Sequence, residues 1–175
     1  WTGLPAGAPL GHATGGGPIV LSRIVGPFVQ TGPDTFRLRF GRAEYTANHR
    51  NHDLWLVAAQ PGAARYRSIV QQAMVHAAPN TAGAPQTISF PALPDQHVGV
   101  PTLKLAATSD SGLPVSCYVL EGPAEIDGNT LRFTPVPPRT RFPVKITVVA
   151  WQFGRSAKPA IWTAATVERS FLLVP

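Results

Sequence analysis

A histidine pair is the clearest group of potentially reactive residues in this chain. In the segment NHRNHD at residues 48–53, His49 and His52 stand three positions apart and Asp53 follows directly. Two imidazole nitrogens at this spacing can hold a metal ion such as zinc, and a carboxylate oxygen can add a ligand. Because no further ligand is evident elsewhere, a solvated polar loop is the favoured interpretation, and we predict neither a metal nor another cofactor. The other histidines are predicted to be isolated surface or half-buried residues: His12, His76 and His97.

Acidic and hydroxyl side chains form no catalytic pattern in the sequence. Glu121, Glu125 and Asp127 gather around the turn EGPAEIDG, but nothing apolar beside them would raise a carboxyl pKa for acid catalysis. The sequence has no Gly-x-Ser-x-Gly motif and no arrangement of Ser, His and Asp that suggests a triad. The glycine-rich GHATGGGP at 11–18 lacks the Lys-Ser/Thr of a phosphate loop. We therefore predict no catalytic residues and no enzymatic activity.

Charge and apolar patterning limit the partners of this chain. The net charge is +6, from fifteen Lys and Arg against nine Asp and Glu. The cations stand singly along the chain without a nucleic-acid motif, so no nucleic-acid partner is predicted. No apolar run approaches the length of a membrane span, so no membrane insertion is predicted. Cys117 is the single cysteine and is predicted to be a small buried apolar residue.

Aromatic residues are the candidates for ligand contact. Strand alternation in VKITVVAWQ, VSCYVLE and DLWLVAAQ turns most apolar side chains inward and leaves Trp151, Tyr118 and Trp55 facing outward. Exposed rings of this kind stack against sugars, whose hydroxyl groups stay hydrated. Polar side chains nearby would supply the hydrogen bonds of such a site: Gln152, Arg155 and Asn48.

The competing interpretation of these aromatic residues is a docking surface. Leu120 and Val149 also face outward beside them, and such an apolar patch packs one module against another or against an upstream domain. Trp162 lies in a Pro- and Ala-rich loop. Its ring either plugs the end of the sandwich or makes a contact from the loop, and we favour the plug. The candidate ligand-binding residues are therefore Trp55, Tyr118, Trp151 and Trp162.

The candidate residues stand on an internal repeat. PIVLSRIVG at 18–26 aligns without a gap with PVSCYVLEG at 114–122. Three further blocks follow in the same order: DTFRLRF (34–40) with NTLRFT (129–134), LWLVAAQPG (54–62) with ITVVAWQFG (146–154), and IVQQAMVHA (69–77) with TVERSFLLV (166–174). Ordered blocks separated by gaps of unequal length indicate a divergent duplication.

The blocks predict an all-β fold. Nineteen prolines and sixteen glycines exclude long helices, and each block alternates apolar residues between turn signals. We predict two tandem immunoglobulin-like β-sandwiches at 1–85 and 86–175, joined by the linker PNTAGAPQ at 79–86. The second has seven predicted strands and a DGN turn. The first is divergent or incomplete, because PAGAPLGHATGGG stands where the second has two strands, which were either lost or lie before Trp1.

The second half resembles the immunoglobulin-like repeat modules of large bacterial secreted and cell-surface proteins. The residues that carry the resemblance are AT (107–108), SGLPV (111–115), GPA (122–124), GNTL (128–131), AWQFG (150–154) and VERSF (167–171). Two residues depart from the family pattern. Family members usually carry a tyrosine after the Gln-x-Gly turn, which the first half keeps as Tyr66, whereas the second half has Trp162 near that position. Arg23 occupies a position that is expected to face inward. The resemblance implies a spacer, an adhesive unit or an appendage of a polysaccharide-degrading enzyme.

Together these observations predict a non-catalytic accessory module of a larger secreted bacterial protein, at the cell surface or outside the cell. The first hypothesis is a spacer or domain-docking unit whose partner is an upstream domain of the same protein. The alternative is a carbohydrate-binding module in which the exposed aromatic residues hold a polysaccharide. A weaker third hypothesis is an enzyme that uses the His49, His52 and Asp53 loop.

Overall fold

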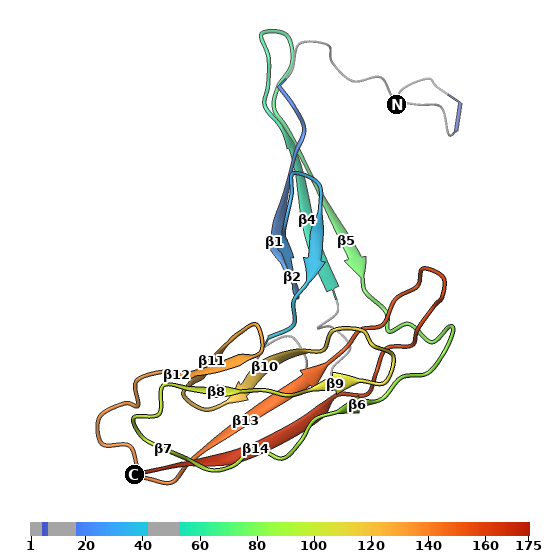
Figure 1. Cartoon of the computed structure of the whole chain (residues 1–175). Helices are drawn as coiled ribbons and strands as arrows, with labels where there is room; N and C mark the ends of the chain where they lie inside the picture. The colour runs from blue at the N-terminus through green and yellow to red at the C-terminus, as the bar shows by residue number, and fades with distance from the viewer. Residues whose placement is uncertain (1–4, 7–16, 42–52) are drawn as a thin grey trace. The chain divides into compact units, whose positions relative to one another are not determined.

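The computed structural model describes residues 5–6, 17–41 and 53–175, and every regular element within them is a β-strand (Figure 1). The predicted all-β class is therefore confirmed. Contacts between Cα atoms divide the chain into two compact units. The first holds the described residues up to Arg39 together with Asp53–His76, and the second holds Phe40 and Ala77–Pro175. Phe40 thus belongs to the second unit although it precedes the boundary predicted at residue 85.

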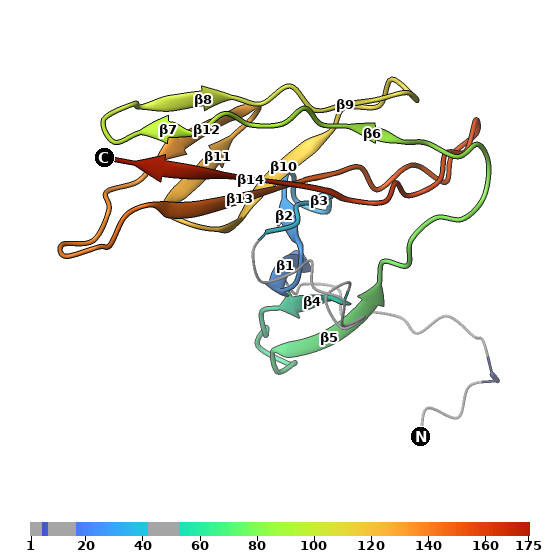
Figure 2. The ribbon, with the colours of Figure 1, turned by 90° about the horizontal axis from the view of Figure 1, so that it is seen from below.

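The second unit is a sandwich of three small sheets. Its largest sheet has the order β10-β13-β14-β7, with β10 at Ser116–Glu121, β13 at Val144–Trp151, β14 at Val167–Val174 and β7 at Gln96–His97. A second sheet has the order β11-β12-β8, with β11 at Ala124–Asp127, β12 at Thr130–Phe133 and β8 at Thr102–Lys104. The short strands β6 (Ile88–Ser89) and β9 (Thr108–Ser109) form the third. Figure 2 shows β8 and β9 on one side of this unit and β13 and β14 on the other.

One apolar cluster forms the core of the second unit. The alternation predicted for β13 holds, since Ile146, Val148 and Ala150 are all fully buried in this cluster. Cys117 packs against it from β10, as predicted for an inward position. Residues from the other strands complete the cluster: Ile88, Phe90, Leu105, Leu131, Ala164, Phe171 and Leu173. Removing this apolar surface from water is the main stabilising contribution to the unit.

The described residues of the first unit form five strands. Three form a sheet of order β1-β4-β5, with β1 at Val20–Val25, β4 at Asp53–Gln60 and β5 at Ile69–His76. The other two form a hairpin, with β2 at Phe28–Gln30 and β3 at Phe36–Leu38. Phe28 is buried against the edge of Phe36, with ring centroids 5.5 Å apart. Among the described residues of this unit, Phe28 is the large hydrophobic residue that is buried.

Strand pairing in the two units follows the predicted repeat. The β1–β4 ladder starts at Val20 opposite Ala59 and skips one residue after Arg23. The β10–β13 ladder starts at the aligned residues, Ser116 opposite Trp151, and skips one residue at the same place. Gly26 and Gly122 then follow with φ angles of 126° and 101°. A Cβ atom on either would meet backbone atoms of the facing strand within about 3 Å, so both turns need glycine.

The last block of the repeat aligns one residue away from the predicted position. The ladders place Met74 opposite Trp55 and Ser170 opposite Thr147, which makes Met74 equivalent to Ser170 rather than to Phe171. The loop before β5 and the loop before β14 differ in length, and β5 has apolar residues at both odd and even positions. Period-two alternation therefore could not choose the register of this block.

The predicted linker at 79–86 is part of the second unit. Asn80 donates through its side-chain amide to the carbonyl oxygens of Arg155 and Ile161, at 3.0 and 2.6 Å. The Ala84 amide donates to Ala160 O at 3.0 Å. These bonds hold the segment along the loop that precedes β14, so its Pro, Gly and Asn residues shape a bound segment and not a free connection.

Candidate functional site

Trp55 is the one predicted ligand contact that lies exposed on a sheet face among the described residues. We call the outer face the side of β1-β4-β5 that carries Trp55, and the inner face the side that carries Leu54 and Leu56. Trp55 stands between Val25 of β1 and Met74 of β5 in the strand ladder. The three side chains are 38%, 55% and 50% exposed respectively. We call them the apolar row.

Polar groups flank the apolar row. Because side chains two residues apart share a face of a strand, Asp53 lies beside Trp55 on the outer face. Its Oδ1 atom is 2.8 Å from Nδ1 of His76, which is its partner in the β4–β5 ladder. On the other side of Trp55, Val57 pairs with Gln72. The outer face therefore combines an exposed ring with hydrogen-bonding groups on both sides.

The equivalent row of the second unit is polar. Glu121, Thr147 and Ser170 occupy the positions of Val25, Trp55 and Met74 in the matching ladders. Oγ1 of Thr147 donates to Oε2 of Glu121 at 3.2 Å and lies 2.9 Å from Oγ of Ser170. The same backbone row thus supports a hydrogen-bonded set of short side chains, and the fold itself does not require apolar residues there.

Tyr118 and Trp151 do not form the exposed surface that the sequence predicted. They lie on the predicted outward side of β10 and β13, but only 6% and 8% of their surface is exposed. Phe40 meets Trp151 edge to face, with centroids 4.8 Å apart and planes at 86°, and stacks on Phe153 at 5.5 Å. Strand alternation reports the side on which a ring lies but not what covers it, so the predicted exposure of these two rings is wrong.

Trp162 is 42% exposed, so the favoured prediction of a plug is also wrong. Its backbone is fixed by two contacts, because its amide donates to Ala84 O at 2.9 Å and its carbonyl oxygen accepts from the side chain of Gln86. The ring instead lies exposed on its loop. Gln152 and Arg155, predicted as donors to a sugar, donate to the carbonyl oxygens of Pro114 and Pro159. Asn48 lies outside the described residues.

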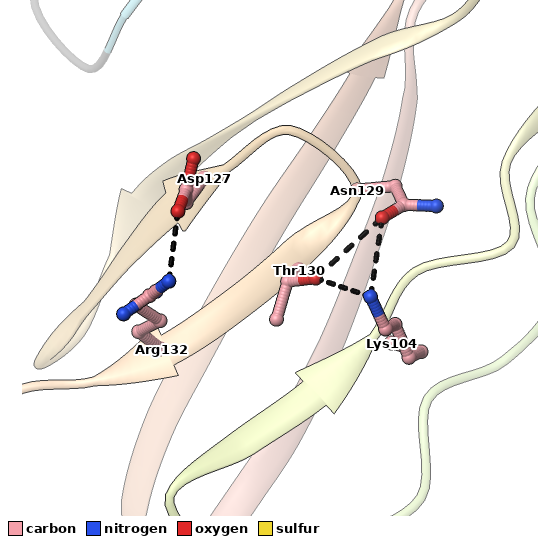
Figure 3. A network of polar contacts seen from close by, with 5 residues as sticks. All are labelled: Lys104, Asp127, Asn129, Thr130 and Arg132. Atoms are coloured by element: carbon pink, nitrogen blue, oxygen red, sulfur yellow. Dashed lines mark hydrogen bonds and ion pairs between the residues drawn. The ribbon is translucent and has the colours of Figure 1, made fainter.

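The acidic turn is a solvated set of surface contacts. Asp127 pairs with Arg132 at 2.8 Å across the β11–β12 hairpin, and both side chains are mostly exposed (Figure 3). Lys104 donates to Thr130 at 2.7 Å beside them. Glu121 contacts Lys145 at 3.3 Å. Exposed pairs of this kind contribute little free energy.

The histidine pair and the cysteine are further potentially reactive groups named from the sequence. His49 and His52 lie outside the described residues, and among those described no three His, Cys, Asp or Glu residues could hold a metal ion together. Burial raises the pKa of the Cys117 thiol from 9.0 to about 11, which removes the thiolate needed for nucleophilic attack. A recess of about 420 Å³ in the second unit is lined almost wholly by apolar residues: Val98, Gly99, Val100, Pro101, Phe133, Thr134, Pro135, Val136 and Leu173.

Comparisons with known proteins find structural neighbours only. No family model matches the chain, and no curated protein matches it. EC1-2 of human protocadherin-24 has a TM-score of 0.35 and 10% identity, with 90% of this chain and 82% of that chain covered. Drosophila N-cadherin EC1-4 has a TM-score of 0.34 and 12% identity, with 90% of this chain and 41% of that chain covered. Mouse cadherin-23 EC22-24 has a TM-score of 0.32 and 18% identity, with 89% of this chain and 52% of that chain covered.

These similarities are too low to assign a fold, so the fold class rests on the strand pairing described above, which is that of an all-β sandwich protein. The chain spans about half or less of the N-cadherin and cadherin-23 chains. The resemblance to bacterial repeat modules is carried by the quoted sequence motifs alone. Among the described residues, no helix has the length and apolar composition needed to cross a membrane.

Proposed function

We propose that this chain is a non-catalytic accessory module of a larger secreted bacterial protein, where it acts outside the cell or at its surface as a spacer or domain-docking unit. The observation that carries the proposal is the apolar row of Val25, Trp55 and Met74. An exposed apolar patch costs solubility, and it is typical of a surface that contacts another domain.

Comparison of the two units supports a contact function for this row. The second unit carries Glu121, Thr147 and Ser170 at the same ladder positions, where they bond to one another. Since the strand pairing is the same in both units, stability of the sheet does not account for Trp55 and Met74. A partner surface that removes them from water accounts for both.

Hydroxyl-radical footprinting tests the docking function. The reactivity of Trp55 and Met74 is compared between the 175-residue chain and the parent protein that contains it. Docking predicts that both side chains react several-fold more slowly in the parent, because a neighbouring domain covers them. Trp162 serves as the control, since it is exposed in the second unit and is expected to react alike in both. Equal reactivity of Trp55 and Met74 in the two proteins would exclude docking on the outer face.

A matched variant separates docking from folding. The substitutions Val25→Glu, Trp55→Thr and Met74→Ser give the first unit the polar row of the second. Because that row is compatible with the same ladder, the variant is expected to fold. In the parent protein, calorimetry should show that the first unit unfolds at the temperature found in the isolated chain, since the docked partner no longer stabilises it.

Carbohydrate binding is the second candidate function. It is favoured by the position of Trp55 beside the Asp53–His76 pair and Gln72, because a ring with polar neighbours is the usual arrangement for holding a sugar. Affinity electrophoresis through gels cast with soluble polysaccharides tests it, with Trp55→Ala as the variant. Phe142→Ala is the control, because Phe142 is an exposed ring outside the predicted ligand contacts. Retardation that is lost only in Trp55→Ala supports this function, and equal migration in every gel excludes it for the polysaccharides tested.

A further inference from the structure

The recess of the second unit is an apolar feature that neither candidate function uses. It has a volume of about 420 Å³ and is lined by residues 98–101 and 133–136 and by Leu173 of β14. Leu173 belongs to the core cluster and is 2% exposed, whereas Val98 is 50% exposed. The recess therefore runs from solvent at Val98 to the core of the sandwich at Leu173.

The backbone around the recess is poorly suited to a polar ligand. Four of its amides already donate to carbonyl oxygens of the same unit, at 2.9 to 3.3 Å: Val98, Val100, Phe133 and Thr134. Pro101 and Pro135 have no amide hydrogen to donate. A ligand rich in hydroxyl groups would lose hydrogen bonds to water here without replacing them, which costs free energy. The lining therefore favours an apolar ligand over a sugar.

The size of the recess matches a short alkyl chain. An engineered apolar cavity of roughly 150 Å³ in another protein holds benzene. The recess, at about 420 Å³, is larger by a factor of about three, so an alkyl chain of about eight carbon atoms fits in it. Such a chain gains free energy by leaving water and needs no hydrogen-bond partner.

A strained arginine follows the recess in the chain. Among the described residues, Arg139 is the one residue other than glycine with a positive φ, of 66°. The Thr140 amide donates to Pro137 O at 3.2 Å, which makes a type II turn with Pro138 and Arg139 at its centre. Glycine or asparagine is favoured at the second central position of this turn. An arginine held there at a conformational cost is typical of a residue whose side chain is used.

The Arg139 side chain is available to a ligand. It is exposed, and it makes no hydrogen bond or ion pair with any other described residue. Val136 lines the recess three residues earlier, so the two Cα atoms lie within about 11 Å of each other. This is close enough for the guanidinium group to meet the head group of a ligand whose chain fills the recess.

The charges around the recess favour an anionic head group. The segments 98–101 and 133–143 contain Arg139 and Arg141 and no Asp or Glu. Asp95 is the nearest acid in the sequence, and its Oδ1 atom accepts a hydrogen bond from a backbone amide of β14 at 2.8 Å. A carboxylate at the opening of the recess therefore meets positive charge.

We propose that the recess binds one single-chain amphiphile, an alkyl carboxylate of the fatty-acid class, with its chain against Leu173 and its carboxylate group at Arg139. The ligand comes from solution. Of the lining residues, Val98 is the one large apolar side chain that is exposed, which is too little surface to enter a bilayer. The site belongs to the second unit and is independent of docking on the outer face of the first.

An NMR titration of the 175-residue chain with octanoate tests the site. The methyl resonances of Val98, Val136 and Leu173, which line the recess, are expected to shift along one saturable curve. Val167 is the internal control. It lies six residues before Leu173 on β14, about 20 Å away along the strand, and its methyl resonances should not shift.

Two variants separate recognition of the head group from burial of the chain. Arg139→Gly removes the cation at a turn position that glycine adopts readily. It is expected to weaken octanoate binding by roughly two- to fivefold and to leave the binding of 1-octanol unchanged. Val98→Ser shortens the apolar rim at an exposed position and should weaken both ligands. Arg132→Gln is the control, because it removes the same charge from an exposed site on β12 and should leave both affinities unchanged.

The outcomes that overturn the proposal are distinct. One is the absence of a saturable shift at Val98, Val136 and Leu173. Another is an octanoate affinity that is unchanged in Arg139→Gly, or reduced equally with that of 1-octanol, since the cation would then not meet the head group. Shifts that appear with phosphatidylglycerol vesicles and not with free octanoate overturn it as well. None of these results changes the footprinting of Trp55, so the docking function is tested separately.

Discussion

Replacement of Trp151 is the strongest test of how the second unit is built. The sequence alone placed Trp151 on an exposed binding surface, where Trp151→Ala would change ligand binding and leave the fold intact. The structure buries the ring to 8% exposure against the edge of Phe40. Trp151→Ala is therefore expected to destabilise the second unit.

The magnitude follows from burial and from one unsatisfied group. Truncation of a buried tryptophan to alanine costs about 3–5 kcal/mol. The indole Nε1 of Trp151 is buried and has no hydrogen-bond partner among the described residues, and leaving such a donor unpaired costs about 1–3 kcal/mol in the folded state. Removing the ring also removes this cost, so we expect a loss near the lower limit, about 3 kcal/mol. Trp151→Phe keeps a ring against Phe40 without the unpaired donor and should cost less than about 1.5 kcal/mol.

Cys117 provides a local assay for this prediction. It is the single cysteine and lies in β10, beside Ala150 of β13, so thiol labelling in urea follows unfolding of the second unit alone. With a urea dependence of about 2 kcal/mol per molar, a loss of about 3 kcal/mol lowers the midpoint by about 1.5 M. Trp55→Ala is the control, because an exposed substitution changes stability by only about 0.5 kcal/mol. Equal midpoints for Trp151→Ala and Trp55→Ala would refute the burial argument.

Two further predictions concern the turn glycines and the thiol. Gly122→Ala puts a Cβ atom 2.8 Å from Lys145 O at a φ of 101°. Gly128→Ala is the control, because its Cβ at a φ of 60° meets nothing within 4 Å, so that the positive φ alone costs about 1–2 kcal/mol. We expect Gly122→Ala to lower the unfolding midpoint more than Gly128→Ala, and equal midpoints would contradict the close approach. Burial raises the Cys117 pKa from 9.0 to about 11, so the folded state prefers the neutral thiol. The resulting stabilisation is full below pH 9 and is lost as the pH rises toward 11. Urea titrations at both ends of this range should show a smaller loss in Cys117→Ala than in the unaltered chain, and an identical loss in both would show that the thiol is not buried.

Sequence alone predicted the strand segments and the repeat that relates the two units. The alignment of Pro18 with Pro114 matches equivalent positions of the β1–β4 and β10–β13 ladders, since Val20 and Ser116 begin them and each ladder skips one residue before its glycine. The register of β5 was missed for lack of these signals. Apolar residues stand at both odd and even positions of β5, and the loop before β5 differs in length from the loop before β14.

The coverage of each sheet face was not predictable from the same patterns. Tyr118 and Trp55 have the same alternation signal, yet one is buried and the other exposed. The difference depends on contacts between residues distant in sequence, of which Phe40 against Trp151 is the clearest. Trp162 was misplaced for a related reason, because backbone hydrogen bonds to Ala84 and Gln86 decide the path of its loop, and composition does not report them.

The pair of units allows stability and function to be separated position by position. Where both units have the same residue type in the same geometry, as at Gly26 and Gly122, the shared backbone turn accounts for it. Where two equivalent positions have the same backbone geometry but different residue types, the fold cannot account for which residue type stands there. Trp55 opposite Met74 stands where Thr147 stands opposite Ser170, and an exposed indole in place of a bonded hydroxyl exposes more apolar surface to water. A partner that covers the indole offsets that cost, and this makes the outer face of the first unit the place where a contact of this chain is to be sought.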